Sequence, residues 1–301
     1  MNGWETINKA KWLAVDTSTS SMTVAVMEGA ELLGENNAKA ERNHSMYLVP
    51  NIQQLLHSLH LRPGDLRAVA VGSGPGSYTG VRIGVTVAKT MAWSLRVPLL
   101  SVSSLEAMAL GGFGRLDLPV DGTVWVVPLM DARRGQVYTG LYAASEWSGE
   151  RKRLTHLPQD DAGTHELSAS DFAGAALSSA VSPLADKRWS CLVSDGIRPM
   201  EQWIGSLRER LQRASAGDES ESPRCIAFVG EVERFVDQTE RLAALWTGTV
   251  TALAHDIRAY DIARLAYPRW LRGESADPFR LVPNYTQPPE AEVKLLGKPV
   301  T

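Results

Sequence analysis

Residues 71–84 constrain the fold of this chain more than any other stretch, because they combine the end of a strand, a glycine-rich turn and the start of a helix. This stretch holds five glycines, follows the apolar residues 68–71 and leads into a long apolar pattern over residues 81–95. In this order, the free backbone N–H groups of the first helical turn can face an anion. The stretch therefore predicts an anion- or nucleotide-binding turn. A tight strand-to-helix connection without a ligand is the alternative.

Two well-known phosphate loops do not fit this turn. No lysine stands before a serine or threonine at the helix start, so the sequence lacks a Walker motif. The dinucleotide fingerprint fails as well, since Ser77 occupies the position of its third glycine and no acidic residue follows about 20 residues later. Either Ser77 or Thr79 is expected to cap the helix, because a short oxygen side chain accepts from free N–H groups of the first turn.

A second polar turn lies near the start of the chain. Asp16 follows the apolar residues 12–15, and the apolar residues 22–27 come next, which predicts a hairpin. Asp16 and the neighbouring hydroxyls could belong to a ligand site, or Asp16 could bond its own backbone in an Asx turn. With the lysine and a complete set of phosphate loops missing, we expect no required cofactor and at most weak binding of ATP or ADP. The candidate nucleotide- or anion-binding residues are Asp16, Thr17, Ser18, Gly74, Gly76, Ser77, Thr79 and Gly80.

Net charge, cysteine count and apolar runs limit the partners and the cellular location that we expect for this protein. The net charge is −3 and the isoelectric point about 6.1, so any RNA would have to be held mainly by a partner or by a local basic patch. The chain has only two cysteines, too few for a disulfide framework or a cysteine metal cluster. Its first residues lack the apolar core of a signal peptide, and no run approaches the roughly 18 apolar residues of a membrane span. We expect a soluble, cytoplasmic protein without membrane contact.

The string Gly-Pro-Gly-Ser-Tyr-Thr-Gly-Val-Arg-Ile-Gly at residues 74–84 resembles the signature of the TsaB (YeaZ) family. The resemblance extends to residues 15–19, 43–45, 130–138 and 283–285; it is close over residues 12–142 and loose beyond them. It implies an α/β structure of the actin-like, RNase H-like (ASKHA) fold with two related lobes. Within that fold, the turn at Asp16 resembles the first phosphate hairpin of the actin-like ATPases, which implies that Asp16 orders a metal or water and that the neighbouring hydroxyls face a phosphate.

The resemblance also suggests a domain division. We expect an N-terminal lobe over residues 1–110 and a C-terminal lobe over residues 111–301, with the glycine-rich residues 111–114 as the break between them. The relatives that the chain resembles are shorter, so part of the polar, weakly periodic residues 143–195 is expected to be an insertion at the surface. The last helix is expected to pack back on the first lobe. Thr286 and Gln287 replace the Leu-Arg that is usual near the end of the family, so any anion contact of that arginine is absent here.

One departure from a related family bears on catalysis. TsaD transferases, the catalytic relatives, carry two metal-binding histidines in a His-Leu-Glu-Ala-His motif, whereas this chain has Ser104 and Met108 at those positions. Neither side chain supplies an imidazole ligand, so we expect no metal site and no catalytic residues. The same loss argues against a metallopeptidase. An ATP-dependent small-molecule kinase of the actin-like fold remains the alternative function.

The resemblance implies an accessory subunit rather than an enzyme. It would serve TsaD in forming threonylcarbamoyladenosine beside the anticodon of tRNAs that read codons starting with A. The implied partners are a TsaD-type transferase in a heterodimer and a TsaE-type ATPase in a larger complex. The chain would form a homodimer when alone and would meet tRNA only through the complex.

Two helical patterns, over residues 45–60 and 81–95, are candidates for the partner surface. The second is apolar nearly all round, and its small residues at spacing four allow another helix to approach closely. A central core helix within one lobe is the alternative. The expected interface residues are Met46, Val49, Gln53, Gly84, Ala88, Met91 and Ala92.

Overall fold

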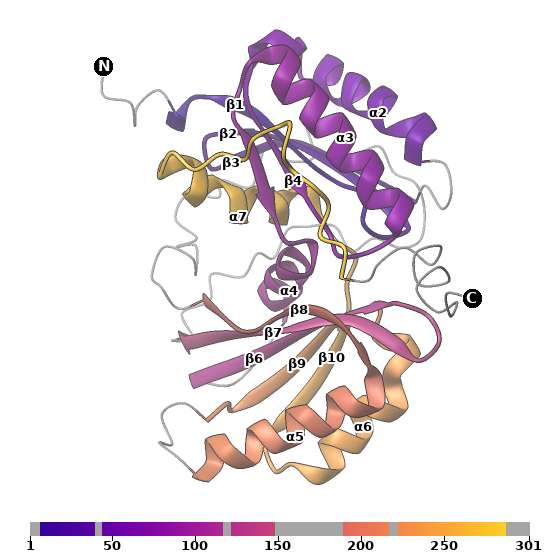
Figure 1. The fold of residues 1–301 in the computed structure, drawn as a ribbon. Coiled ribbons are helices and arrows are strands. Elements are labelled where there is room, and N and C mark those ends of the chain that lie inside the picture. Colours follow the sequence, from indigo (N-terminus) through magenta and orange to yellow (C-terminus); the bar gives the residue numbers. More distant parts are fainter. Residues whose placement is uncertain (1–6, 40–43, 117–121, 148–188, 217–221, 287–301) are drawn as a thin grey trace, which may run out of the picture.

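The computed structural model describes residues 7–39, 44–116, 122–147, 189–216 and 222–286, and these form two lobes. Each lobe is built on a five-stranded mixed sheet (Figure 1). None of the described helices is both long enough and apolar enough to cross a membrane.

The sheet of the N-terminal lobe has the order β3-β2-β1-β4-β5. β1 (Lys11–Asp16), β2 (Ser21–Glu28) and β3 (Glu31–Lys39) are antiparallel neighbours, while β4 (Leu66–Gly72) and β5 (Leu99–Val102) run parallel to β1. β1 is buried on both faces, which explains its continuous apolar sequence. Leu13 and Val15 point towards α2 (His44–Ser58) and α3 (Tyr78–Leu95), whereas Trp12 and Ala14 pack on the other face.

The sheet of the C-terminal lobe repeats this arrangement. Its order is β8-β7-β6-β9-β10, so each strand matches a strand of the first lobe in order and position. The strands are β6 (Gly122–Asp131), β7 (Gln136–Trp147), β8 (Trp189–Pro199), β9 (Cys225–Gly230) and β10 (Thr249–Ala254). The helices α5 (Met200–Ala216) and α6 (Val236–Leu245) cover its outer face (Figure 1). The prediction of an actin-like, RNase H-like fold with two related lobes is therefore confirmed.

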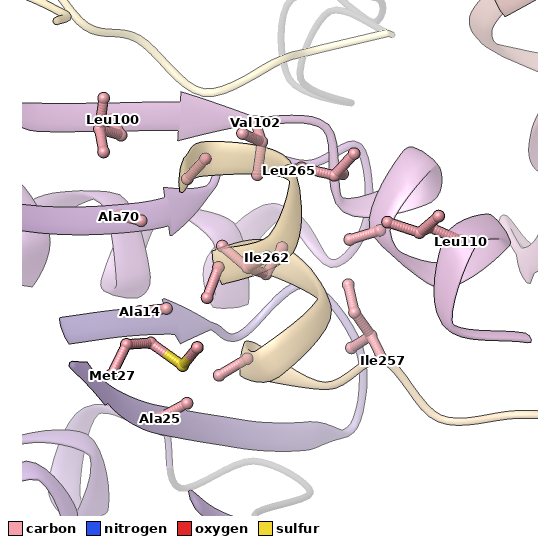
Figure 2. Close-up of a cluster of buried hydrophobic side chains, with 14 of the residues drawn as sticks. Ala14, Ala25, Met27, Ala70, Leu100, Val102, Leu110, Ile257, Ile262 and Leu265 are labelled. Carbon is pink, nitrogen blue, oxygen red and sulfur yellow. The ribbon is translucent and has the colours of Figure 1, made fainter. Parts of the chain in front are cut away.

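The last helix of each lobe packs between the two sheets. α4 (Ser104–Arg115) follows β5 of the first lobe but packs on β6 and β9 of the second. α7 (Ala259–Leu271) follows β10 of the second lobe but packs on β1, β2 and β5 of the first. Figure 2 shows Ile262 of α7 near Ala14 of β1, and Leu265 of α7 beside Val102 of β5. This exchange of helices ties the two lobes together.

The structure differs from the domain expectations in two places. Residues 111–114 are the last turns of α4 and not a break between lobes. Gly111 and Gly112 permit close packing there, since a Cβ at Gly112 would lie 2.7 Å from the side chain of Val229. Both ends of the expected insertion, residues 143–147 and 189–195, are strand residues of β7 and β8, and its remainder, residues 148–188, lies outside the described residues. Gln287 also lies outside them.

Candidate functional site

The glycine-rich turn leads directly from β4 into α3, as predicted. Ser77 is the N-cap of α3, and its hydroxyl accepts from the N–H of Gly80 at 3.3 Å. Thr79 lies exposed in the first helical turn and does not cap the helix. The local sequence thus determines where the helix begins.

The turn between β1 and β2 packs against this glycine-rich turn. The N–H of Ser77 donates to the carbonyl oxygen of Ser18 at 2.7 Å, and the hydroxyl of Thr17 donates to the carbonyl oxygen of Gly80 at 2.7 Å. A Cβ at Gly76 would lie 2.3 Å from Ser18 O, and one at Gly80 would lie 2.1 Å from Thr17 O. The glycines therefore allow one backbone to approach another, which favours the ligand-free alternative for this turn.

Asp16 joins three segments at this position. It is fully buried, and its Oδ1 accepts from both the N–H and the hydroxyl of Ser18 at 2.7 Å, which is the Asx turn that the sequence left open. Its Oδ2 accepts from Ser104 Oγ at 2.6 Å, and Ser104 Oγ accepts in turn from the N–H of Gly74 at 3.0 Å. Burial raises the pKa of Asp16, and these hydrogen bonds oppose that rise.

The two positions that distinguish this chain from the transferases are both occupied by structural side chains. Ser104 lies in the first turn of α4 and bridges Asp16 to Gly74. Met108 is buried on the same helix, and its sulfur would lie 2.6 Å from a Cβ at Gly230. Across the described ranges, no group of three or more His, Cys, Asp or Glu side chains is placed to hold a metal ion.

Part of the expected partner surface is accessible to solvent, namely the outer face of α2. Met46 is 64% exposed, Val49 is 45% exposed, and Gln53 is also exposed. On α3, Met91 is half-buried. α2 and α3 lie side by side on the side of the N-terminal lobe that points away from the other lobe (Figure 1).

The small-residue row on α3 is not at the surface, so that part of the interface prediction is wrong. Gly84, Ala88 and Ala92 are all buried, and Ala88 has no exposed area at all. Ala88 and Ala92 pack in the core that α2, α3 and the sheet form together. A Cβ at Gly84 would lie 2.4 Å from the hydroxyl of Thr17. The row allows α3 to approach its own lobe, which was the alternative interpretation.

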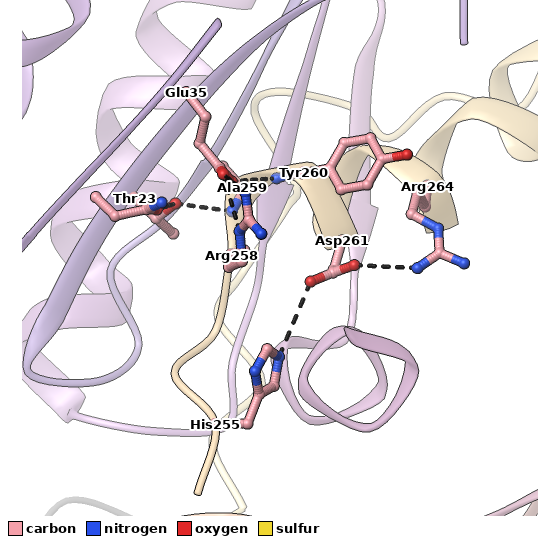
Figure 3. A network of polar contacts seen from close by, with 9 residues as sticks. Thr23, Glu35, His255, Arg258, Ala259, Tyr260, Asp261 and Arg264 are labelled. Carbon is pink, nitrogen blue, oxygen red and sulfur yellow. Dashed lines mark hydrogen bonds and ion pairs between the residues drawn. The ribbon is translucent and has the colours of Figure 1, made fainter. Parts of the chain in front are cut away.

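A polar network that the sequence did not reveal holds the start of α7 (Figure 3). Glu35 of β3 accepts from the guanidinium of Arg258 and, at 2.9 Å, from the N–H of Tyr260. Thr23 of β2 accepts from the N–H of Ala259 at 2.8 Å. Two side chains of the N-terminal lobe thus bind the free N–H groups of a helix more than 220 residues later. Such distant pairs leave no local sequence signal.

His255 lies in the same region, between β10 and α7. Its ring is fully buried, neither ring nitrogen has a hydrogen-bond partner, and Nε2 is 4.0 Å from Asp261 Oδ2. Burial, together with the positive charges of Arg115 and Arg258, lowers the pKa of His255 to about 3. The imidazole is therefore neutral at pH 7 where the two lobes meet.

Comparison with known proteins gives matches in both sequence and structure. The family model described as TsaD, tRNA N6-adenosine threonylcarbamoyltransferase, matches residues 35–153. The tRNA threonylcarbamoyladenosine biosynthesis protein TsaB of Bacillus subtilis is 46% identical over 130 residues, which are 43% of this chain and 54% of that protein. The Escherichia coli protein of the same name is 35% identical over 153 residues, covering 49% and 62%. The chain thus matches less than two thirds of the length of these relatives.

Solved structures extend the likeness in fold to nearly the whole chain. The structure titled YeaZ from Pseudomonas aeruginosa superposes with a TM-score of 0.61 at 21% identity, covering 92% of this chain and 99% of that one. At this low sequence identity, the superposition shows a shared fold only. The sequence matches support the family that the motif of residues 74–84 predicts.

Proposed function

We propose that this protein is a member of the TsaB (YeaZ) family, which its sequence matches in part, and that it is a non-catalytic accessory subunit in tRNA threonylcarbamoyladenosine biosynthesis. It acts beside a TsaD-type transferase, which carries out the transfer to the adenosine next to the anticodon of tRNAs that read codons starting with A. A TsaE-type ATPase joins the two in a larger complex.

One observation carries the accessory role. The transferase family model matches this chain across α4, yet the two positions that hold metal-binding histidines in the transferases are Ser104 and Met108 here. Ser104 bonds Asp16, and Met108 packs in the core. Neither side chain ligates a metal as imidazole does, so this chain has the fold of a transferase without its ligands.

The exposed face of α2 supports a protein partner. Met46 and Val49 are large apolar side chains that the chain leaves exposed on one helix, and such side chains side by side on a surface mark interaction sites. We assign the contact with the TsaD-type transferase to this face, with Gln53 beside it and Met91 of α3 at its edge. The same face serves a homodimer when the transferase is absent.

Met46→Glu is expected to reduce co-purification of the TsaD-type transferase from the same cell by more than tenfold, because the charge would be buried in an apolar contact. Co-expression followed by affinity capture and gel filtration measures this. Leu245→Glu is the matched control, since Leu245 is equally apolar and exposed but lies on α6 of the other lobe. The Leu245 variant should co-purify like the wild type.

Reconstitution tests the function itself. Synthase, transferase, TsaE-type ATPase and tRNA are combined with and without this chain, and modified adenosine is measured. Modification should depend on this chain, and the chain alone should produce none. Full modification without it, or modification by the chain in the absence of the transferase, contradicts the accessory role.

Nucleotide binding is proposed to be weak and dispensable. The N–H of Ser77, which a phosphate would need, already donates to Ser18, and the glycines that would admit a phosphate admit that turn instead. Calorimetric titration of the full chain with ATP and magnesium should give a dissociation constant of about 1 mM or weaker, equivalent to roughly 4 kcal/mol of binding free energy. A micromolar constant would instead favour the small-molecule kinase.

A further inference from the structure

The last described residues of the chain run antiparallel to α3 as a segment with a turn at residues 278–280, and residues 276–285 are called the strap here (Figure 1, yellow). Its backbone is held at three points. Ala276 N–H donates to Leu99 O, Lys89 Nζ donates to Leu281 O, and Asn284 N–H donates to Ser73 O, each at 2.7 Å. The strap is thereby fixed along the whole length of α3.

The strap and α3 together expose two pairs of aromatic rings. At the C-terminal end of α3, Trp93 and Phe279 meet edge to face with their centroids 6.5 Å apart, and they are 61% and 76% exposed. At the N-terminal end, Tyr78 and Tyr285 lie 5.2 Å apart and are also exposed. Rings fixed in this way but open to solvent lose little conformational freedom when a flat ligand stacks on them.

Positive charge accompanies these rings. The guanidinium of Arg82 lies 5.1 Å from the ring centroid of Tyr78, and Arg280 is exposed on the strap beside Phe279, where it pairs with Asp277 at 3.6 Å. Residues 66–105 contain Arg67, Arg82, Lys89 and Arg96 and no acidic residue, although the chain as a whole is acidic. The surface formed by Tyr78, Arg82, Trp93, Phe279, Arg280 and Tyr285 is named the strap flank.

The strap flank is separate from the partner face of α2, which is the exposed face around Met46 and Val49 to which we assign the transferase. At 3.6 residues per turn, Tyr78, Arg82, Lys89 and Trp93 fall on one side of α3, and each contacts the strap or a neighbour on this side. Met91, at the edge of the partner face, falls on the other side of the helix. The two surfaces can therefore be occupied at the same time.

We infer that the strap flank binds an unpaired segment of RNA. Its aromatic pairs stack on bases, and Arg82 and Arg280 contact phosphates, a combination typical of sites for single-stranded nucleic acid. The two pairs are about 22 Å apart along α3, which is a span of several nucleotides. The inference rests on the proposed function for the choice of tRNA among RNAs. It extends that function, since this chain then touches tRNA directly and not only through its partners.

Charge favours RNA over an additional protein as the occupant. The helix that forms one half of the flank carries cations and no carboxylate, which suits a polyanion, and the counterions that phosphates release add to the binding free energy. Stacking on exposed rings tolerates any base, so the site needs no sequence-specific hydrogen bonds.

The test measures binding of the full chain to a fluorescein-labelled 12-nucleotide oligouridine and to unmodified tRNA by fluorescence anisotropy at low salt. The double variant Trp93→Ala/Phe279→Ala should bind at least tenfold more weakly. Arg82→Gln should reduce the slope of log K against log salt by about 0.7, the value for one phosphate contact on a single strand. Leu245→Ala and Arg62→Gln are the controls, and both should stay within twofold of wild type, since these exposed side chains belong to α6 and to the connection between α2 and β4 and not to the flank. Thermal unfolding checks that each variant is folded.

Three results overturn the inference: no RNA binding by the wild type, a double variant that binds within twofold of wild type, or flank variants that keep RNA binding and lose the transferase. The last result makes the flank a protein interface. Failure of the proposed function looks different, because tRNA modification would then proceed without this chain while the flank still bound RNA. If tRNA modification depends on this chain but the flank variants bind RNA like the wild type, the RNA-binding inference is wrong and the proposed function stands.

Discussion

Ala88→Arg is expected to unfold the N-terminal lobe rather than to detach a partner. Ala88 is completely buried between α3 and the sheet, so arginine would bring both excess volume and an unpaired charge into a filled core. The cost is several kcal/mol, comparable with the whole stability of a typical domain, which is about 5–15 kcal/mol. The effect is measured as loss of soluble protein, or as loss of the cooperative unfolding transition when far-ultraviolet circular dichroism is followed against urea concentration.

Thr86→Arg is the matched control for this prediction. Thr86 lies on the same helix but is exposed, and a substitution there should change the free energy of unfolding by no more than about 0.5 kcal/mol. A folded Ala88→Arg protein with the stability of the Thr86 variant would show that α3 does not pack on the sheet through this side.

The local features of the fold could be predicted from sequence because their causes are local. The strand, turn and helix around residues 71–84 follow from neighbouring residues, and so does the cap at Ser77. The replacement of two histidines by Ser104 and Met108 could be recognised from the sequence motif alone. The hydroxyl bridge from Ser104 to Asp16 was not predictable, since it joins residues 88 positions apart.

The side of α3 that faces the sheet could not be read from the sequence. A helix that is apolar nearly all round gives no clear stripe, so Gly84, Ala88 and Ala92 indicated a close approach without indicating what approaches. In the structure, the turn that contains Thr17 lies against the start of α3. This close approach requires glycine at the helix positions that face Thr17. A row of small residues identifies a contact distance and not a partner.

The exchange of α4 and α7 between the lobes was also beyond a local pattern. Each helix has an ordinary apolar face, and nothing in that face says which of two similar sheets it will cover. We expect side chains at the helix start to decide between them, and for α7 these come from the N-terminal lobe: Thr23 and Glu35 accept from its first N–H groups. We therefore expect the specificity of the interlobe packing to lie in this small polar network, which substitution of Glu35 tests.

Glu35→Ala is therefore expected to destabilise the protein by about 3–5 kcal/mol, the range for removing one partner of a buried ion pair. The side chains of Glu35 and Arg258 are almost fully buried, and the same carboxylate also accepts from the first turn of α7. Its loss removes a charged hydrogen-bond partner and a helix cap together. Urea denaturation measures the change, and amide hydrogen exchange should show α7 losing protection before the strands of the C-terminal lobe do.

The control and the partner substitution make this expectation specific. Glu31→Ala, on the same strand but exposed, should cost no more than about 0.5 kcal/mol. In the double variant Glu35→Ala/Arg258→Ala, the buried guanidinium is gone as well, so the total cost should fall well below the sum of the two single costs. Additive costs, or a Glu35 variant as stable as the Glu31 variant, would mean that hydrophobic packing alone holds α7 on the first lobe. In that case the choice between the two sheets lies in the apolar contacts of Ile262 and its neighbours and not in the polar network.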